Sequence, residues 1–195
     1  MTPELAGHPD RLRWNARFAA RPAPAFTPHP LIVAALAMSL PGGPVLELAC
    51  GPSGSALLAA ELSRRVTAVD VSDVGLGQLA GEAGRRGLGR VLTVLQADVT
   101  TWRAEHLSYA LVLCTGYWDE GAFRGAARAV APGGLLAWEA LTEQARELRP
   151  GLPAEWCLGP GEPAALLPAS LAVLEQEDLP GLARRRMLAR SSAEI

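Results

Sequence analysis

The stretch Val45-Leu46-Glu47-Leu48-Ala49-Cys50-Gly51-Pro52-Ser53-Gly54-Ser55, followed by Val66-Thr67-Ala68-Val69-Asp70, decides the fold of this chain. Each apolar run has the length of a buried strand, and the glycine-containing segment after the first run predicts a turn into a helix. A carboxylate, Asp70, then stands at the tip of the second strand. This order is typical of a site for an adenosine-containing cofactor at the carboxyl edge of a parallel sheet.

Glu47, four residues before the turn glycine Gly51, indicates which cofactor is expected. A dinucleotide site places a pyrophosphate at this loop, and an acidic side chain entering the loop would repel it. A cofactor with an amino-acid tail and a sulfonium offers positive charge to the same carboxylate. We therefore expect S-adenosylmethionine (SAM) rather than NAD.

Length and composition predict one domain over residues 1–195. The hydrophobic fraction of 49% in 195 residues is enough for a sizeable core. The net charge is -2 and all 18 basic residues are arginine, so no broad basic face for nucleic acid is expected. Cys50, Cys114 and Cys157 show no pairing pattern and are expected to be reduced.

The chain also lacks recognisable targeting features. No apolar run is long enough to span a bilayer, and residues 1–4 lack a charged-then-apolar signal. We expect a cytoplasmic protein with a small-molecule partner and neither a nucleic-acid nor a membrane partner.

Strand and helix patterns alternate along most of the chain. Helices are expected over about 10–20, 31–40, 54–64 and 74–86, and strands over 45–49, 65–70, 91–96, 109–114 and 135–139. In the first helix, Asp10 is the expected cap. This alternation predicts an α/β fold with a doubly wound parallel sheet.

The tail departs from that rhythm. Residues 170–178 and 182–190 read as strands joined at Pro180-Gly181. A two-residue turn would place Glu177 opposite Arg184 and Glu175 opposite Arg186, with each pair stabilising the hairpin by about 0.2–1 kcal/mol. Alternatively, the two charge runs are solvated faces. We expect a mostly parallel seven-stranded sheet closed by this antiparallel C-terminal hairpin.

The order Glu47…Gly51, Asp70, Ala97-Asp98 and Pro132-Gly133-Gly134 resembles that of a class I SAM-dependent methyltransferase over nearly the whole chain. A closer resemblance is to the small tellurite-resistance and thiopurine methyltransferase-like group. It rests on Trp14-Asn15-Ala16-Arg17-Phe18 and on Gly159-Pro160-Gly161-Glu162. The resemblance implies methyl transfer to a small molecule, with residues 1–28 as a lid or acceptor wall and 29–195 as the SAM-binding core.

Several residues are expected to hold the cofactor. A carboxylate at Asp70 can accept both ribose hydroxyls, although it could instead cap the next helix, where Ser72 and Asp73 are better placed. The resemblance places the adenine amine at Asp98, which could otherwise be only a turn aspartate. Where the family usually has its first and third glycines, this chain has alanine and serine. The expected cofactor residues are Trp14, Glu47, Ala49, Gly51, Ser53, Asp70, Val71, Asp98, Val99 and Cys114.

The acceptor is expected beside Cys114-Thr115-Gly116-Tyr117-Trp118-Asp119, which follows the central strand. The resemblance places the reacting methyl group there, and Tyr117 and Trp118 could flank a sulfonium through cation–π contact. Alternatively, these aromatic residues only pack the loop onto the core. The candidates for the acceptor pocket are Phe18, Tyr117, Trp118 and Asp119.

No catalytic base can be named from the sequence. A soft or anionic acceptor needs none, and the candidates otherwise are His8, His29, Asp119, Glu139 and Glu143. No Cys or His pair has metal-ligand spacing, so no metal is expected. The resemblance includes tellurium or selenium oxyanions and aromatic thiols as acceptors. A SAM-binding module without catalysis is the alternative, and a nucleotide-dependent oxidoreductase is disfavoured by Glu47.

Overall fold

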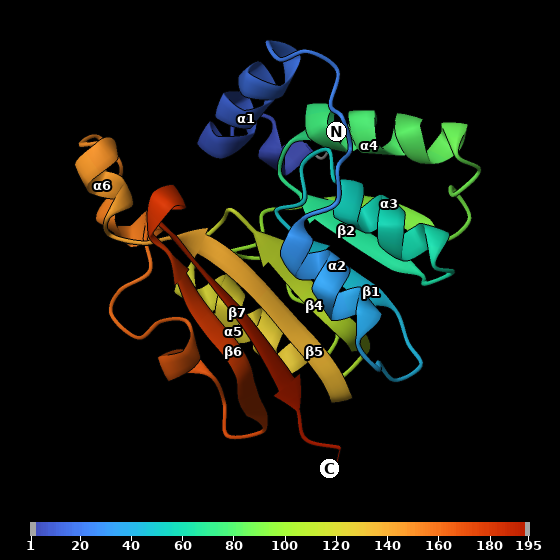
Figure 1. Cartoon of the computed structure of the whole chain (residues 1–195). Helices are drawn as coiled ribbons and strands as arrows, with labels where there is room; N and C mark the ends of the chain where they lie inside the picture. The colour runs from blue at the N-terminus through green and yellow to red at the C-terminus, as the bar shows by residue number, and fades with distance from the viewer. Residues whose placement is uncertain (1–2, 194–195) are drawn as a thin grey trace.

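The computed structural model describes residues 3–193, so the ends of the predicted 1–28 segment and 29–195 core lie outside the described residues. Seven strands form one sheet in the order β3-β2-β1-β4-β5-β7-β6 (Figure 1). The strands from β1 to β5 pair in parallel, and β7 pairs antiparallel with both β5 and β6. This confirms the predicted fold class. The strands are β1 Val45–Leu48, β2 Val66–Asp70, β3 Leu92–Gln96, β4 Tyr109–Thr115, β5 Val130–Leu141, β6 Leu171–Leu179 and β7 Arg184–Ser191.

Helices cover both faces of the sheet (Figure 1). The α-helices are α1 Pro9–Ala19, α2 Pro30–Ala37, α3 Gly54–Glu61, α4 Asp73–Arg85, α5 Glu120–Ala129 and α6 Ala145–Leu148, and short 3-10 turns are η1 Pro3–Leu5, η2 Ala154–Trp156, η3 Ala164–Leu166 and η4 Pro180–Leu182. One face packs against α2, α3 and α4, and the opposite face packs against α5. Within residues 3–193, no helix is both long and apolar enough to cross a membrane.

The core forms because successive residues of each buried strand point to opposite faces. In β1, Val45 packs with α2 and α3, whereas Leu46 packs on the α5 side. Trp138 on β5 is fully buried, and its ring centroid lies 5.1 Å from that of Phe123 on α5. Fully burying a large apolar side chain contributes roughly 1.5–3 kcal/mol. The two layers therefore fix the strand ends from which the site is built.

The first helix, α1, lies over the carboxyl ends of the strands (Figure 1). Its predicted cap was wrong: Pro9 is the first helical residue and His8 the N-cap, so Asp10 lies inside the first turn. Polar contacts hold α1 to α4: Arg11 Nε and Asn15 Nδ2 each donate to Asp73 Oδ1 at 2.8 Å. The segment predicted as an N-terminal wall therefore contains helix α1, which is held against α4.

The C-terminal hairpin exists, but its predicted register was wrong. Glu177 pairs with Arg186, and Asp178 pairs with Arg185. The connection is longer than two residues because η4 and Ala183, with a left-handed φ of 49°, separate the strands. The predicted contact between Glu175 and Arg186 persists at 3.8 Å despite the shift, but Arg186 Nη2 lies closer to Glu177 Oε2, at 2.6 Å. The shift also brings Arg184 to the first residue of β7, beside the carboxyl end of β5.

Candidate active site

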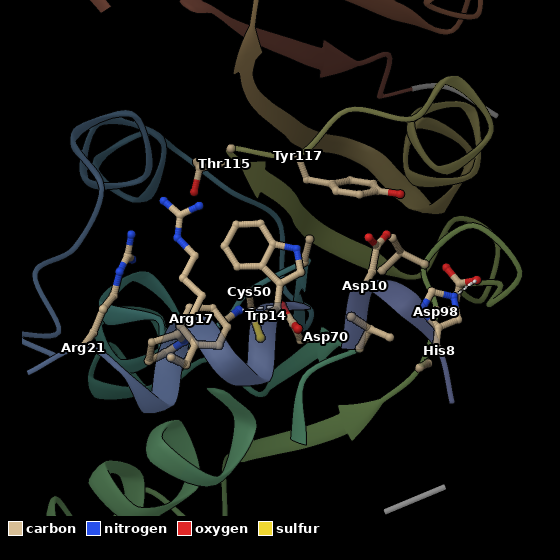
Figure 2. Close-up of a pocket in the computed structure, with 18 of the residues that line it drawn as sticks. His8, Asp10, Trp14, Arg17, Arg21, Cys50, Asp70, Asp98, Thr115 and Tyr117 are labelled. Carbon is tan, nitrogen blue, oxygen red and sulfur yellow. Dashed lines mark hydrogen bonds and ion pairs between the residues drawn. The ribbon is translucent and has the colours of Figure 1, made fainter. Parts of the chain in front are cut away.

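A pocket of about 440 Å³, which we call the main pocket, lies under α1 at the carboxyl ends of β1, β2 and β4. Figure 2 shows Trp14, Arg17 and Arg21 reaching into it from α1 and the residues after it, with Thr115 and Tyr117 across from them. The structure therefore brings most predicted site residues to one place. The predicted residues that line this pocket are Trp14, Phe18, Ala49, Gly51, Asp70, Val71, Asp98, Val99 and Tyr117.

The loop after β1 requires unusual backbone conformations. Gly51 has a left-handed φ of 51°, and a Cβ there would meet Phe18 Cζ at 2.9 Å. Ala49 is also left-handed, with a φ of 49°. This conformation costs an L-residue about 1–2 kcal/mol, which explains why glycine suits this position in the resembled family. The loop is thus held tightly, with Phe18 of α1 packed on it.

Asp70 holds the glycine loop from the tip of β2. Its Oδ2 accepts the Gly51 N–H and its Oδ1 accepts the Ser72 N–H, both at 2.7 Å. Burial raises the pKa of Asp70, and these backbone hydrogen bonds oppose the rise. Ser72, and not Asp70, caps α4 through a 3.0 Å hydrogen bond from Gly75 N–H. Each carboxylate oxygen can accept a further hydrogen bond from a ligand in the pocket.

Asp98 stands beside His8 at the end of the main pocket that lies across from Arg17 and Arg21 (Figure 2). Both of its carboxylate oxygens accept from Thr100: Oδ1 from the amide at 2.9 Å and Oδ2 from the hydroxyl at 2.7 Å. The aspartate thus stabilises its own turn and also faces the pocket. His8 Nε2 lies 3.5 Å from Asp98 Oδ2, while His8 Nδ1 is buried without a hydrogen-bond partner among the described residues.

Glu47 lines an adjoining pocket of about 370 Å³, the side pocket, which shares Cys50, Pro52 and Thr115 with the main pocket. Its carboxyl group is 3% exposed, and burial raises its pKa to about 8. The hydrogen bond from Ser53 opposes this rise, and the charge of Asp70 adds to it. The Ser53 hydroxyl also accepts the Ala56 N–H at 3.0 Å and so caps α3. Serine at the family's third glycine position therefore has a structural role.

Three predicted residues line neither the main pocket nor the side pocket. Cys114 is fully buried in β4, with its Sγ directed at the Tyr117 carbonyl oxygen 3.8 Å away. Trp118 is 6% exposed and packs 5.5 Å from the Phe123 ring, as the packing alternative predicted, and it also lines the third hollow described below. The Asp119 carboxylate caps α5, because its Oδ1 accepts the Ala122 N–H at 2.7 Å. The structure assigns each of these three a structural contact.

His29 and Glu139, both candidate bases, are bound to each other. His29 Nε2 lies 3.3 Å from Glu139 Oε2, and His29 Nδ1 accepts the Leu31 N–H at 3.3 Å. Arg184 Nη1 donates to Glu139 Oε1 at 3.1 Å. Burial would raise the pKa of Glu139, but His29 and Arg184 outweigh it and lower this pKa. These contacts engage both His29 nitrogens and keep Glu139 ionised. Glu143, a further candidate base, is exposed.

Arginines of the site were not among the residues predicted from the sequence. Arg17 lies three residues after Trp14, and this spacing puts both on one face of α1, so helical periodicity could have found it. Arg184 reaches the main pocket from β7 through the hairpin, and no local pattern signals that position. Residues 3–193 contain no cluster of three or more His, Cys, Asp or Glu side chains suited to a metal ion.

A third hollow of about 220 Å³, which we call the arginine pocket, opens beside the main pocket between α1 and the segment 141–156. It is lined by four arginines, Arg13, Arg17, Arg149 and Arg184. Trp14, Gly116 and Tyr117 line both this hollow and the main pocket. The two hollows therefore meet at the carboxyl end of β4.

Comparisons with known proteins agree with this geometry. A family model described as a methyltransferase domain matches residues 45–134, from the start of β1 into β5. No curated protein matches the sequence. A solved structure described as "Conversion of a Disulfide Bond into a Thioacetal Group during Echinomycin Biosynthesis" matches with a TM-score of 0.70 at 19% identity, covering 95% of this chain and 94% of that chain.

Two further solved structures are similar. One is geranyl diphosphate C-methyltransferase from Streptomyces coelicolor A3(2) with Mg²⁺, geranyl diphosphate and S-adenosyl-L-homocysteine (TM-score 0.66, 12% identity, 84% of this chain and 78% of that chain). The other is the [4+2]-cyclase SpnF (TM-score 0.66, 18% identity, 84% and 81%). The family model covers less than half of the chain, and the likenesses at 12% to 19% identity show its fold; the closer tellurite-resistance and thiopurine resemblance remains a prediction. The chain thus has the Rossmann-like methyltransferase fold, and its residues 45–134 match the methyltransferase-domain family.

Proposed function

We propose that this chain transfers a methyl group from SAM to a small-molecule acceptor and releases S-adenosylhomocysteine. One observation carries the proposal: carboxyl groups stand at three separate places around the glycine loop. Asp70 lines the middle of the main pocket, Asp98 lines its end beside His8, and Glu47 lines the adjoining side pocket. SAM presents two ribose hydroxyls, an adenine amine and an ammonium group, each of which a carboxylate can bind.

The chemistry of the donor set fits this cofactor. Asp70 would accept the ribose hydroxyls, Asp98 the adenine amine, and Glu47 the ammonium group. Val71 and Val99 line the same pocket and offer apolar surface to the adenine ring. The absence of a Cβ at Gly51 lets a ligand approach the backbone closely.

The remaining charges of the cofactor have partners on α1. Arg17 lines the main pocket and would bind the carboxylate of the amino-acid tail. Trp14 and Tyr117 flank the border of the two pockets and would stabilise a sulfonium through cation–π contact, worth roughly 0.5–2 kcal/mol. When bound, SAM supplies a methyl group on a positively charged sulfur.

The chain's own part in the reaction is to position the acceptor. Holding the acceptor atom in line with the methyl group lowers the barrier without any proton transfer. Burial raises the pKa of Tyr117, so its phenol keeps its proton and can donate a hydrogen bond. His29, Glu139 and Asp119 are engaged in the contacts described above, which favours an acceptor that is soft or already anionic.

A second candidate is a SAM-binding protein that does not transfer the methyl group. The same engaged candidate bases favour it, as does the likeness to a cyclase of the same fold. Only a turnover assay separates it from the first.

Titration calorimetry with SAM and with NADH, followed by a methylation screen with labelled SAM, tests the proposal. The screen covers thiols, chalcogen oxyanions, phenols and amines. Asp70→Asn should weaken SAM binding about 10- to 100-fold because one charge-assisted acceptor is lost. Asp178→Asn, on the edge strand β6 and outside the lining of the three pockets, is the matched control and should not change SAM binding. Tight binding of NADH but not SAM would refute the proposal, and SAM binding without any turnover would favour the second candidate.

A further inference from the structure

The arginine pocket carries more positive charge than its acidic neighbours balance. Arg13 Nη2 pairs with Asp10 Oδ1 at 2.9 Å, and Arg184 pairs with Glu139. Arg17 and Arg149 form no ion pair with any residue in the range 3–193. Asp10 also lines this hollow but pairs with Arg13, so the guanidinium groups of Arg17 and Arg149 line it without an ion-pair partner among the described residues.

These cations also crowd one another. Burial lowers the pKa of Arg17, and the charges of Arg21, Arg149 and Arg13 lower this pKa further. Neighbouring guanidiniums repel when no anion lies between them, so an anionic ligand would relieve a repulsion already present in the free protein.

Apart from Asp10 and Tyr117, the rest of the lining is mainly apolar. The Arg13 guanidinium stacks 4.3 Å from the Trp156 ring centroid, and the Arg17 guanidinium lies 5.0 Å from that of Trp14. Leu141 and Leu152 complete the apolar part of the wall. A guanidinium held on an indole is pre-organised for a carboxylate or phosphate, and the indole surface suits a planar body.

The position of the hollow connects it to the proposed reaction. Tyr117 and Gly116 line it together with the main pocket, so a ligand in it would approach the border where the methyl group is expected. Arg17 also lines the main pocket and can be occupied by the cofactor's carboxylate. Arg149 lines only the arginine pocket, which leaves it for another anion.

We propose that the arginine pocket binds the methyl acceptor and that Arg149 recognises an ionised group on it, so that the acceptor is a small planar organic anion. The identification of this ligand as the methyl acceptor rests on the proposed function, whereas the binding of anions in the pocket can be tested without it. Carboxylate and phosphate groups both match the guanidinium geometry.

The test is a calorimetric titration of the full chain with matched probes, both with and without S-adenosylhomocysteine. The probes share one ring system: 2-naphthoate against 2-naphthamide, and 2-naphthyl phosphate against 2-naphthol. We expect each anion to bind at least about tenfold more tightly than its neutral partner, the size of one charge-assisted hydrogen bond. Whichever anion binds more tightly identifies the preferred ionised group.

Substitutions test whether Arg149 is responsible for the preference for anionic over neutral probes. Arg149→Gln should reduce the ratio of anion affinity to neutral-probe affinity to less than about threefold. Arg149→Lys should retain most of this ratio because the charge remains. Arg124→Gln, an exposed position on α5, is the matched control and should not alter it. SAM affinity should be the same in Arg149→Gln as in the unsubstituted chain.

Equal binding of the charged and neutral probes, or a preference that survives Arg149→Gln, would overturn this inference while leaving the proposed function intact. Failure of the chain to bind SAM would instead refute the proposed function, and the titrations without S-adenosylhomocysteine would still decide whether the pocket selects anions.

Discussion

The Ser53 hydroxyl lies 2.8 Å from Oε1 and 2.7 Å from Oε2 of Glu47, and this contact joins β1 to the start of α3. Glu47 is almost fully buried, so the hydroxyl replaces only part of the water that the carboxylate loses. The free protein therefore favours the protonated acid, with a pKa of about 8. Any cationic ligand that reaches the side pocket has to compete with that proton.

Glu47 should make SAM binding depend on pH. An ammonium group favours the ionised carboxylate, so binding should release a proton below pH 8 and affinity should rise from pH 6 to pH 8, by at most about tenfold per unit. Calorimetry in two buffers of different ionisation enthalpy measures the proton released. Glu47→Gln should bind SAM more weakly and with little pH dependence, whereas Glu120→Gln on the outside of α5 should behave as the original chain.

The raised pKa of Glu47 should also make the stability of the folded chain depend on pH. The folded-state pKa of Glu47 is raised above its ordinary value of 4.5, so the native state holds a proton that the unfolded chain releases between those pH values. Stability of the free chain should therefore fall as pH rises from about 4.5 to about 8, and Glu47→Gln should flatten that slope. Identical slopes for the two chains in denaturant titrations would contradict this assignment.

Ala49 offers a stabilising substitution. Its left-handed φ of 49° costs about 1–2 kcal/mol, and glycine removes that cost while losing about 0.4–1 kcal/mol through the unfolded chain. Ala49→Gly should therefore raise the melting temperature by up to about 2–4 °C. Ala59→Gly, inside α3 with ordinary helical geometry, should lower it. A decrease of equal size in both variants would show that Ala49 is not strained.

The parts of the site that sequence predicts are those fixed by local rules. Strand, glycine turn and helix follow from apolar spacing and backbone freedom, so Gly51 and Asp70 could be placed from their neighbours alone. Arg184 could not, because its position depends on a hairpin connection whose length is set by Ala183 and η4. Trp118 illustrates a different limit: its sequence neighbours are loop residues, but its packing partners lie on α5 and β5.

The hairpin should be essential for folding because β7 lies between β5 and β6 instead of at the sheet's edge. Truncation after Gly181 removes β7 and exposes the edge of β5, so the product should aggregate or lose its cooperative melt. Met187→Ala is the milder variant: this side chain is fully buried, and the substitution should cost about 2–5 kcal/mol. Leu174→Ala on exposed β6 should cost far less, and a soluble truncated chain with an unchanged melting curve would disprove the argument.

Tyr117 and Trp118 are adjacent in the sequence, but we expect substitution of Tyr117 to reduce mainly turnover and substitution of Trp118 to reduce mainly stability. Trp118 packs against Phe123 and Trp138, so Trp118→Ala should cost about 3–5 kcal/mol of stability. Tyr117 lines the border of the main and arginine pockets, so Tyr117→Ala should lower turnover far more than SAM affinity. Thermal melts, SAM titrations and steady-state kinetics on both variants separate the two effects. If Tyr117→Ala instead lost SAM affinity in proportion to its activity, Tyr117 would belong to the cofactor site and the acceptor would have to lie elsewhere.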